Sequence, residues 1–162
     1  MTETLSPGAE SAEASVSGTT EDRKPSFGFA PAMVSVLSPV GAQADAIRAL
    51  RTHLMAQHIN LGRRALAFCA PSSGVGCSFT AANTAVSLSQ IGVRTLLIDG
   101  DLRRPALDQL IRPWRMSAGL AQCLQSSDDS FGASIEADVL PNFSVMFAGH
   151  ATTNPQELLA GD

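Results

Sequence analysis

A run of small residues, 71–76, stands where it could hold a phosphate group. It follows the apolar stretch 65–70, whose length predicts a buried strand, and precedes residues 77–88, whose pattern predicts a helix. Backbone N–H groups in such a loop can point at an anion, and the helix N-terminus adds positive potential. The residues predicted to make these contacts are Ser73, Gly74, Val75, Gly76, Cys77, Ser78 and Phe79.

One position departs from the phosphate-binding signature G-x-x-x-x-G-K-[ST]. In that signature the lysine reaches the β- and γ-phosphates and the hydroxyl binds magnesium. Ser78 supplies the hydroxyl here, but Cys77 stands at the lysine position. A thiol at a helix N-terminus can be reactive, or it can simply fill space as a small side chain. The sequence leaves both interpretations of Cys77 open.

Asp99 ends a second apolar stretch, 94–99, and Asp101 follows two residues later. Two strands joined by a helix of this length predict a right-handed βαβ unit with parallel strands. The loops after both strands then open at the same edge of the sheet, so the acids should lie beside the phosphate turn. Carboxylates and a hydroxyl suit Mg²⁺, which gives Ser78, Asp99 and Asp101 as predicted ligands. A carboxylate at a strand end can also cap a helix, and that alternative stays open.

Composition limits the class of protein. The chain has 162 residues with a net charge of −4, which gives no indication of a nucleic-acid partner. Residues 1–30 are rich in small and polar residues and predict a disordered tail, which leaves residues 31–162 as one domain. The sequence shows neither a signal peptide nor a long apolar run, so we expect a cytoplasmic protein. Its three cysteines, Cys69, Cys77 and Cys123, are expected to be free thiols.

The other elements are predicted from periodicity and turn residues. Residues 31–39 are expected to be extended, and residues 42–59 should form a helix with an apolar stripe through Ile47, Leu50 and Leu54. Further helices are predicted at 106–111, from 120, and from Pro155, with a third strand inside 140–149.

Three charged residues recur on another face of the predicted helix 42–59. Asp45, Arg48 and Arg51 are spaced by three residues, which places them on one side of the helix. Such a face is either solvated, with a weak ion pair, or a contact with another subunit. The spacing alone does not decide between the two.

In this order the motifs resemble those of the bacterial tyrosine kinases (BY-kinases) of capsule and exopolysaccharide synthesis, relatives of the ParA/MinD ATPases. The resemblance covers the chain from about Leu37 onward. The Asp45–Arg48–Arg51 face is similar to the family's E-x-x-R-x-x-R element, and residues 71–78 (PSSGVGCS) occupy the Walker A position. Residues 96–105 (LLIDGDLRRP) are nearly a verbatim Walker A′ segment, and the motifs at Gly119 and at 148–149 and 154–159 follow in order.

The resemblance implies an α/β fold, a MinD/ParA-like P-loop domain with a parallel sheet, that binds ATP and Mg²⁺ through the predicted residues. It implies catalytic roles for Asp99 and Asp101 and a ring of subunits assembled through Asp45, Arg48 and Arg51. It also implies a membrane polysaccharide co-polymerase adaptor as partner, which would hold the protein at the inner membrane.

Three departures from the family pattern bear on activity. Cys77 replaces the Walker A lysine, and Ser72 stands where MinD-like proteins have a second lysine. The only lysine is Lys24, and the chain has no tyrosine to phosphorylate. No Walker B strand occurs before the chain ends, so we expect either a fragment or a natural short form. The lysine and tyrosine counts favour a degenerate regulatory relative, a pseudokinase, over an active tyrosine kinase. The run 103–105 (RRP) makes the third alternative, a ParA/MinD-like ATPase switch, less favoured.

Overall fold

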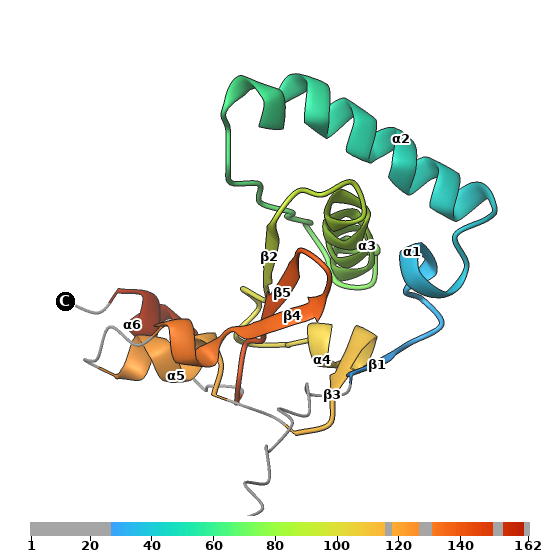
Figure 1. Ribbon diagram of the computed structural model, residues 1–162. Helices are drawn as coiled ribbons and strands as arrows, with labels where there is room; N and C mark the ends of the chain where they lie inside the picture. The colour runs from blue at the N-terminus through green and yellow to red at the C-terminus, as the bar shows by residue number, and fades with distance from the viewer. Residues whose placement is uncertain (1–26, 116–117, 127–130, 151–153, 161–162) are drawn as a thin grey trace, which may run out of the picture.

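A three-stranded sheet lies at the centre of the protein. The computed structural model describes residues 27–115, 118–126, 131–150 and 154–160. The strand order is β2 (Thr95–Ile98), β5 (Phe143–Met146) and β4 (Glu136–Leu140) (Figure 1). β2 and β5 are parallel, with Thr95 opposite Phe143, whereas β4 and β5 are antiparallel. The predicted α/β class is confirmed, but the sheet is mixed because β4 turns directly into β5.

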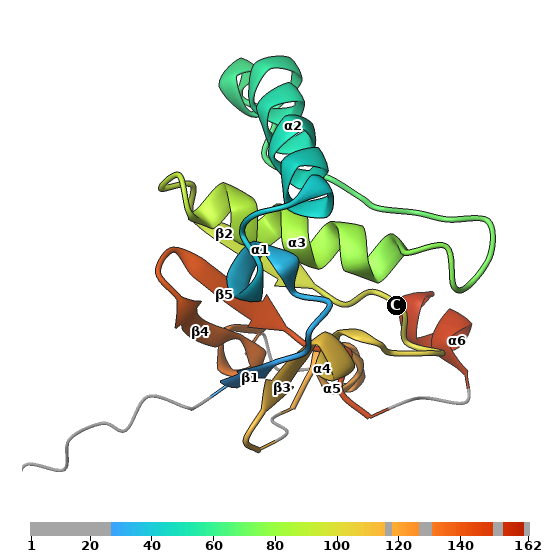
Figure 2. The same ribbon diagram turned by 90° about the vertical axis from the view of Figure 1, so that its right-hand side faces the viewer.

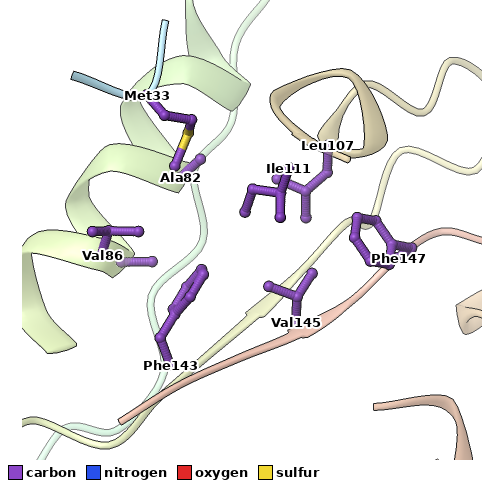
Figure 3. Packing of buried hydrophobic residues seen from close by; sticks show 9 residues of the cluster. Met33, Ala82, Val86, Leu107, Ile111, Phe143, Val145 and Phe147 are labelled. Carbon is purple, nitrogen blue, oxygen red and sulfur yellow. The ribbon is translucent and has the colours of Figure 1, made fainter. Parts of the chain in front are cut away.

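Helix α3 (Cys77–Ser89) covers one face of this sheet (Figures 1 and 2). Its small side chains allow close packing, and residues 82–89 are all buried. Ala82 and Val86 of α3 join Phe143 and Val145 of β5 in the main hydrophobic cluster (Figure 3). The predicted helix and third strand are therefore confirmed, and together they form the core.

Helix α2 (Ala42–Gln57) packs on α3 at the top of the molecule (Figure 1). Ile47 and Leu54 of the predicted stripe are buried, together with Ala44, while Leu50 is half-buried. A short 3₁₀ helix, η1 (Ile59–Leu61), follows α2. The helix predicted at 42–59 is confirmed to within two residues, since its periodicity matches the face that α3 covers.

The segment predicted to be extended, residues 31–39, contains a short helix instead, α1 (Val34–Leu37). Asn83 of α3, fully buried, explains the difference. Its side chain accepts the Ser35 N–H over 2.9 Å and donates to the Ala32 carbonyl over 2.9 Å, and the Ser35 hydroxyl donates to the Asn83 carbonyl. These long-range hydrogen bonds stabilise one helical turn that local sequence does not specify.

A two-stranded antiparallel ribbon was not predicted. β1 (Phe27–Phe29) pairs with β3 (Ile111–Pro113), which directly follows helix α4 (Leu107–Leu110). Phe27, Phe29 and Ile111 pack against the main cluster, so the ribbon is anchored on the core. β1 also shortens the predicted tail: residues 27–30 belong to the folded part, and residues 1–26 lie outside the described residues.

Helix α5 (Leu120–Gln125) begins against the chain that leaves β5. The Leu120 and Ala121 N–H groups donate to the carbonyls of Phe147 and Ala148 over 2.8 and 2.9 Å. Only glycine fits at residue 119, because a Cβ there would lie 2.3 Å from the amide nitrogen of Gly149. A second cluster joins Ala121, Ala148 and Leu102, with Leu158 of helix α6 (Pro155–Leu159) against it. A short 3₁₀ helix, η2 (Phe131–Ser134), precedes β4.

The strand predicted at residues 65–70 is wrong. These residues form no strand and, apart from half-buried Phe68, are exposed. Leu66 is 40% exposed. An isolated strand has no hydrogen-bond partners, and the three strands of the sheet pair only with one another. The predicted βαβ unit therefore lacks its first strand, and β2 is an edge strand.

Candidate functional site

The turn at residues 71–76 is open to solvent. Ser73, Gly74 and Val75 are exposed, and Gly76 is half-buried. Gly74 and Gly76 have φ of +81° and +88°, in the left-handed region that glycine adopts without strain, and no atom lies within 4 Å of an added Cβ at either position. The main chain of the turn is therefore accessible to a ligand.

The first turn of α3 has the backbone geometry of an anion-binding helix N-terminus. The carbonyl of Gly76 accepts both the N–H and the hydroxyl of Thr80, each over 2.9 Å. The first amides of a helix have no intrahelical acceptor, and no side chain caps this helix. The N–H groups of Cys77, Ser78 and Phe79 therefore suit an oxyanion, assisted by the dipole of a 13-residue helix. Ser78 is exposed at this end, and Cys77 is half-buried.

Asp99 directly follows β2 and binds backbone amides. Its N–H extends the β2–β5 ladder by donating to the Met146 carbonyl over 2.9 Å. Its Oδ2 accepts the N–H groups of Ala106 and Leu107 over 3.1 and 3.0 Å, and its Oδ1 accepts that of Asp101 over 3.1 Å. Asp99 thus caps the start of α4, which is the helix-cap alternative that the sequence left open. Its Oδ1 accepts one N–H group and keeps further acceptor capacity.

Asp101 is more exposed than Asp99 and holds the turn that follows it. Its Oδ1 accepts the N–H groups of Arg103 and Arg104 over 3.2 and 2.9 Å. These are local side-chain to backbone bonds, typical of aspartate in turns. They engage one oxygen of Asp101, and the other faces solvent without a hydrogen bond to the described part of the chain. A cation could take this second oxygen as a ligand.

A small pocket of about 10 Å³ lies behind Asp99, with room for about one water molecule. Asp108 also lines it, and the Oδ1 of Asp108 is buried with no hydrogen-bond partner in the described residues. Sequence reasoning missed Asp108, since one acid in the first turn of a helix is common. The remaining lining residues are Pro105, Phe147, Ala148 and Gly149.

The two predicted halves of the site lie at the same end of the molecule. Figure 2 shows the N-terminal end of α3 and the loop after β2 on the right-hand side of the fold. Within the described ranges, no three His, Cys, Asp or Glu side chains form a group that could hold a metal ion. Binding by Ser78, Asp99 and Asp101 stays a prediction.

The charged face of α2 has partners within the chain. Asp45 and Arg48 form an ion pair, and Arg48 also donates to the Pro39 carbonyl over 2.6 Å. Arg51 turns towards α3, where it donates to the carbonyl and the hydroxyl of Ser87, each over 3.2 Å. Asp45 and Arg48 are thus available at the surface, whereas Arg51 joins two helices. A contact with another subunit stays a prediction.

Among the described residues, no helix has both the length and the apolar character that crossing a bilayer requires.

Several tyrosine-protein kinases are similar in sequence to this chain, although no family model matches it. The putative tyrosine-protein kinase CapB of Staphylococcus aureus is 30% identical over 122 residues, which are 75% of this chain and 53% of CapB. The putative tyrosine-protein kinase EpsB of Ralstonia solanacearum is 33% identical over 121 residues, which are 16% of EpsB. The tyrosine-protein kinase Wzc of Salmonella typhi is 29% identical over 130 residues, which are 18% of Wzc.

Solved structures agree with these relatives. The BceF tyrosine kinase domain matches with a TM-score of 0.66 and 31% identity, covering 80% of this chain and 50% of that chain. The chimerical protein CapA2B2 matches with a TM-score of 0.64 at 24% identity, which supports the fold alone. The chain therefore spans about half the length of CapB and of the BceF chain.

Proposed function

Because the chain belongs to the bacterial tyrosine kinase (BY-kinase) family, we propose that it is a BY-kinase-like protein of capsule or exopolysaccharide synthesis and export with impaired phosphoryl transfer. In this proposal it is a cytoplasmic, nucleotide-binding regulatory subunit. A membrane polysaccharide co-polymerase adaptor holds it at the inner membrane. Its similarity to tyrosine-protein kinases and the accessible turn before α3 support the proposal.

ATP would be held at the turn before α3. The backbone amides of residues 73–79 would bind its phosphates, and the Ser78 hydroxyl with Asp99 and Asp101 would hold Mg²⁺. Mg²⁺ bound there would supply charge neutralisation at the phosphoryl group. The residues present fit this role in part, since Asp101 keeps one free oxygen and Asp99 keeps acceptor capacity on Oδ1.

Cys77, the first residue of α3, carries the proposal. A thiol cannot supply the positive charge of a lysine at the β- and γ-phosphates, and the only lysine of the chain is Lys24. By analogy with the loss of one oxyanion donor, the barrier to phosphoryl transfer should rise by about 3–4 kcal/mol, or roughly 100-fold or more in rate. Backbone contacts do not depend on this side chain, so weak nucleotide binding should persist.

An active ATP-dependent tyrosine kinase is the second candidate. The hydrogen bonds that fix Asp99 and Asp101 after β2 favour it, because they hold two carboxylates in defined positions at the end of this strand. The proposed assembly through Asp45, Arg48 and Arg51 is common to both candidates.

Restoring the lysine tests the proposal. The unchanged chain, given labelled ATP and a tyrosine-containing peptide, should transfer no phosphate above background. Cys77→Lys should tighten ATP binding, measured by titration calorimetry, by roughly 10- to 100-fold, since a charged hydrogen bond to phosphate is regained.

Cys69→Lys is the matched control, because it adds the same side chain at an exposed position outside the turn. It should leave ATP affinity unchanged. Robust transfer by the unchanged chain would establish the active kinase instead. Equal affinity of Cys77→Lys and the unchanged chain would mean that the turn does not hold phosphate.

A further inference from the structure

The β1–β3 ribbon ends in an exposed tryptophan. Trp114, the only tryptophan of the chain, directly follows β3 and is 88% exposed. Tryptophan side chains are on average largely buried. Exposed tryptophans are typical of surfaces that bind a partner protein or lie at a membrane interface. Trp114 adds nothing to the hydrophobic clusters of the fold, so its position calls for another explanation.

Two arginines flank this tryptophan. Arg112 and Arg115 are both exposed. Arg112 pairs with Gly28 of β1, and a Cβ added at Gly28 would lie 3.7 Å from the Arg112 Cβ, so both positions share the outer face of the ribbon. The absence of a side chain at Gly28 leaves that face to the arginine.

The ribbon is locally basic. The chain carries a net charge of −4, yet no acidic residue occurs in the sequence between positions 23 and 44 or between 109 and 127. The acid nearest to β3 in the sequence, Asp108, lines the pocket beside Asp99, where its Oδ1 is buried. A negatively charged partner would therefore be attracted to the exposed arginines at this end of the ribbon.

The base of the ribbon is firmly held. Ile111 is fully buried, Phe27 and Phe29 pack on the main cluster, and the Ala30 N–H donates to the Leu110 carbonyl over 2.9 Å. The ribbon lies at the bottom of the molecule in both views, whereas α2 lies at the top (Figures 1 and 2). A flat surface could contact the ribbon end while α2 stays accessible.

We propose that the end of the β1–β3 ribbon binds the surface of an anionic lipid bilayer. Trp114 enters the headgroup region, which its amphipathic ring favours, and Arg112 and Arg115 bind lipid phosphates. A bilayer suits this surface better than an acidic peptide. Peptides usually bind in grooves of a protein, whereas Trp114 protrudes from the ribbon with 88% exposure, as tryptophans at a membrane interface do. This contact is independent of the nucleotide turn and would act beside any adaptor.

Trp114 is its own probe. When the full chain is mixed with vesicles of phosphatidylglycerol and phosphatidylcholine in equal parts, its fluorescence should shift to shorter wavelength. The chain should also float with these vesicles. Vesicles of phosphatidylcholine alone should give neither effect, and high salt should reverse both. Arg112→Gln with Arg115→Gln should weaken binding by roughly 25-fold, about fivefold for each charge lost.

Arg63→Gln with Arg64→Gln is the matched control, since these two arginines are also exposed and also lie close together in the chain. It should leave vesicle binding within twofold. Trp114→Ala should weaken flotation without altering the circular dichroism spectrum. Equal losses in both arginine pairs, or equal binding to zwitterionic vesicles, would overturn the proposal. So would a spectral shift on concentrating the protein without vesicles, which indicates self-association, or an equal shift with polyglutamate.

Discussion

The two loops of the candidate site differ in what holds them. The loop after β2 is fixed by five backbone N–H groups that donate to Asp99 and Asp101. The turn before α3 follows eight residues, 63–70, that form no strand and are mostly exposed. Both loops contain glycine and proline, and both follow apolar runs of similar length. Only one of the runs, β2, has a neighbouring strand.

The difference shows which features of a site are local. A carboxylate that accepts nearby amides organises its own loop, and the necessary residues lie within eight positions in the sequence. The turn 71–76, in contrast, would be fixed by a strand at 65–70 only if that strand paired with another strand, and such a pairing strand is distant in the sequence. β2 is an edge strand, and its Leu96 and Ile98 are 43% and 49% exposed, so the sheet has uncovered apolar surface beside this edge.

Replacing one phenylalanine in each region should give the largest contrast. Phe143→Ala empties a fully buried position in β5 and should lower the free energy of unfolding by about 3–5 kcal/mol. Phe68→Ala, in the run 65–70, should lower it by about 1 kcal/mol at most, because that side chain is only half-buried. Urea unfolding measures both. Similar losses would mean that residues 65–70 are packed in solution, and the comparison would fail.

In the loop after β2, the destabilisation caused by replacing each acid should increase with the number of backbone N–H groups that the acid accepts. Asp99→Ala leaves three N–H groups without their acceptor and should lower the free energy of unfolding by about 2 kcal/mol. Asp101→Ala releases two amides that solvent can satisfy, so about 1 kcal/mol or less is expected. Thermal and urea unfolding should give the same order. The reverse order would show that Asp99 is not a helix cap.

Glycine substitutions should give the smallest contrast. Gly76→Ala forces alanine to a φ of +88° and should cost about 1 kcal/mol, although no neighbour blocks the new methyl group. Gly100→Ala is the matched change in the fixed loop, where the space is equally open and φ is not in the left-handed region. Its unfolding midpoint should stay unchanged or rise slightly. Equal destabilisation by the two variants would contradict the conformation of the turn.

Periodicity and turn residues predict much of the fold. The amphipathic pattern of α2, the small residues of α3, the apolar run of β2 and Pro155 at the start of α6 all carry local signals, and each element occurs where it is predicted. The elements that sequence reasoning missed depend on distant contacts. α1 is held by Asn83, and each strand of the β1–β3 ribbon is three residues long, too short to show alternation.

The candidate site divides in the same way. Asp99 and Asp101 are recognisable from their place after an apolar run, and the structure finds them at the end of β2. Residues 65–70 form no strand, although their run of apolar residues is similar to that of β2. An apolar run indicates that a segment tends to be buried, but it does not indicate which strand pairs with it. Asp108 gave no signal because the pocket that it lines is completed by Phe147 and Ala148, about forty residues away in the sequence.

The start of α5 has a consequence for the order of assembly during folding. Its six residues are too few for a helix to persist alone, and the acceptors for its first amides are the carbonyls of Phe147 and Ala148. Those carbonyls take up their positions only when β5 has joined the sheet. We therefore expect α5 to form late, after a segment that is synthesised more than twenty residues behind it, so a nascent chain should hold α5 unfolded until β5 has left the ribosome.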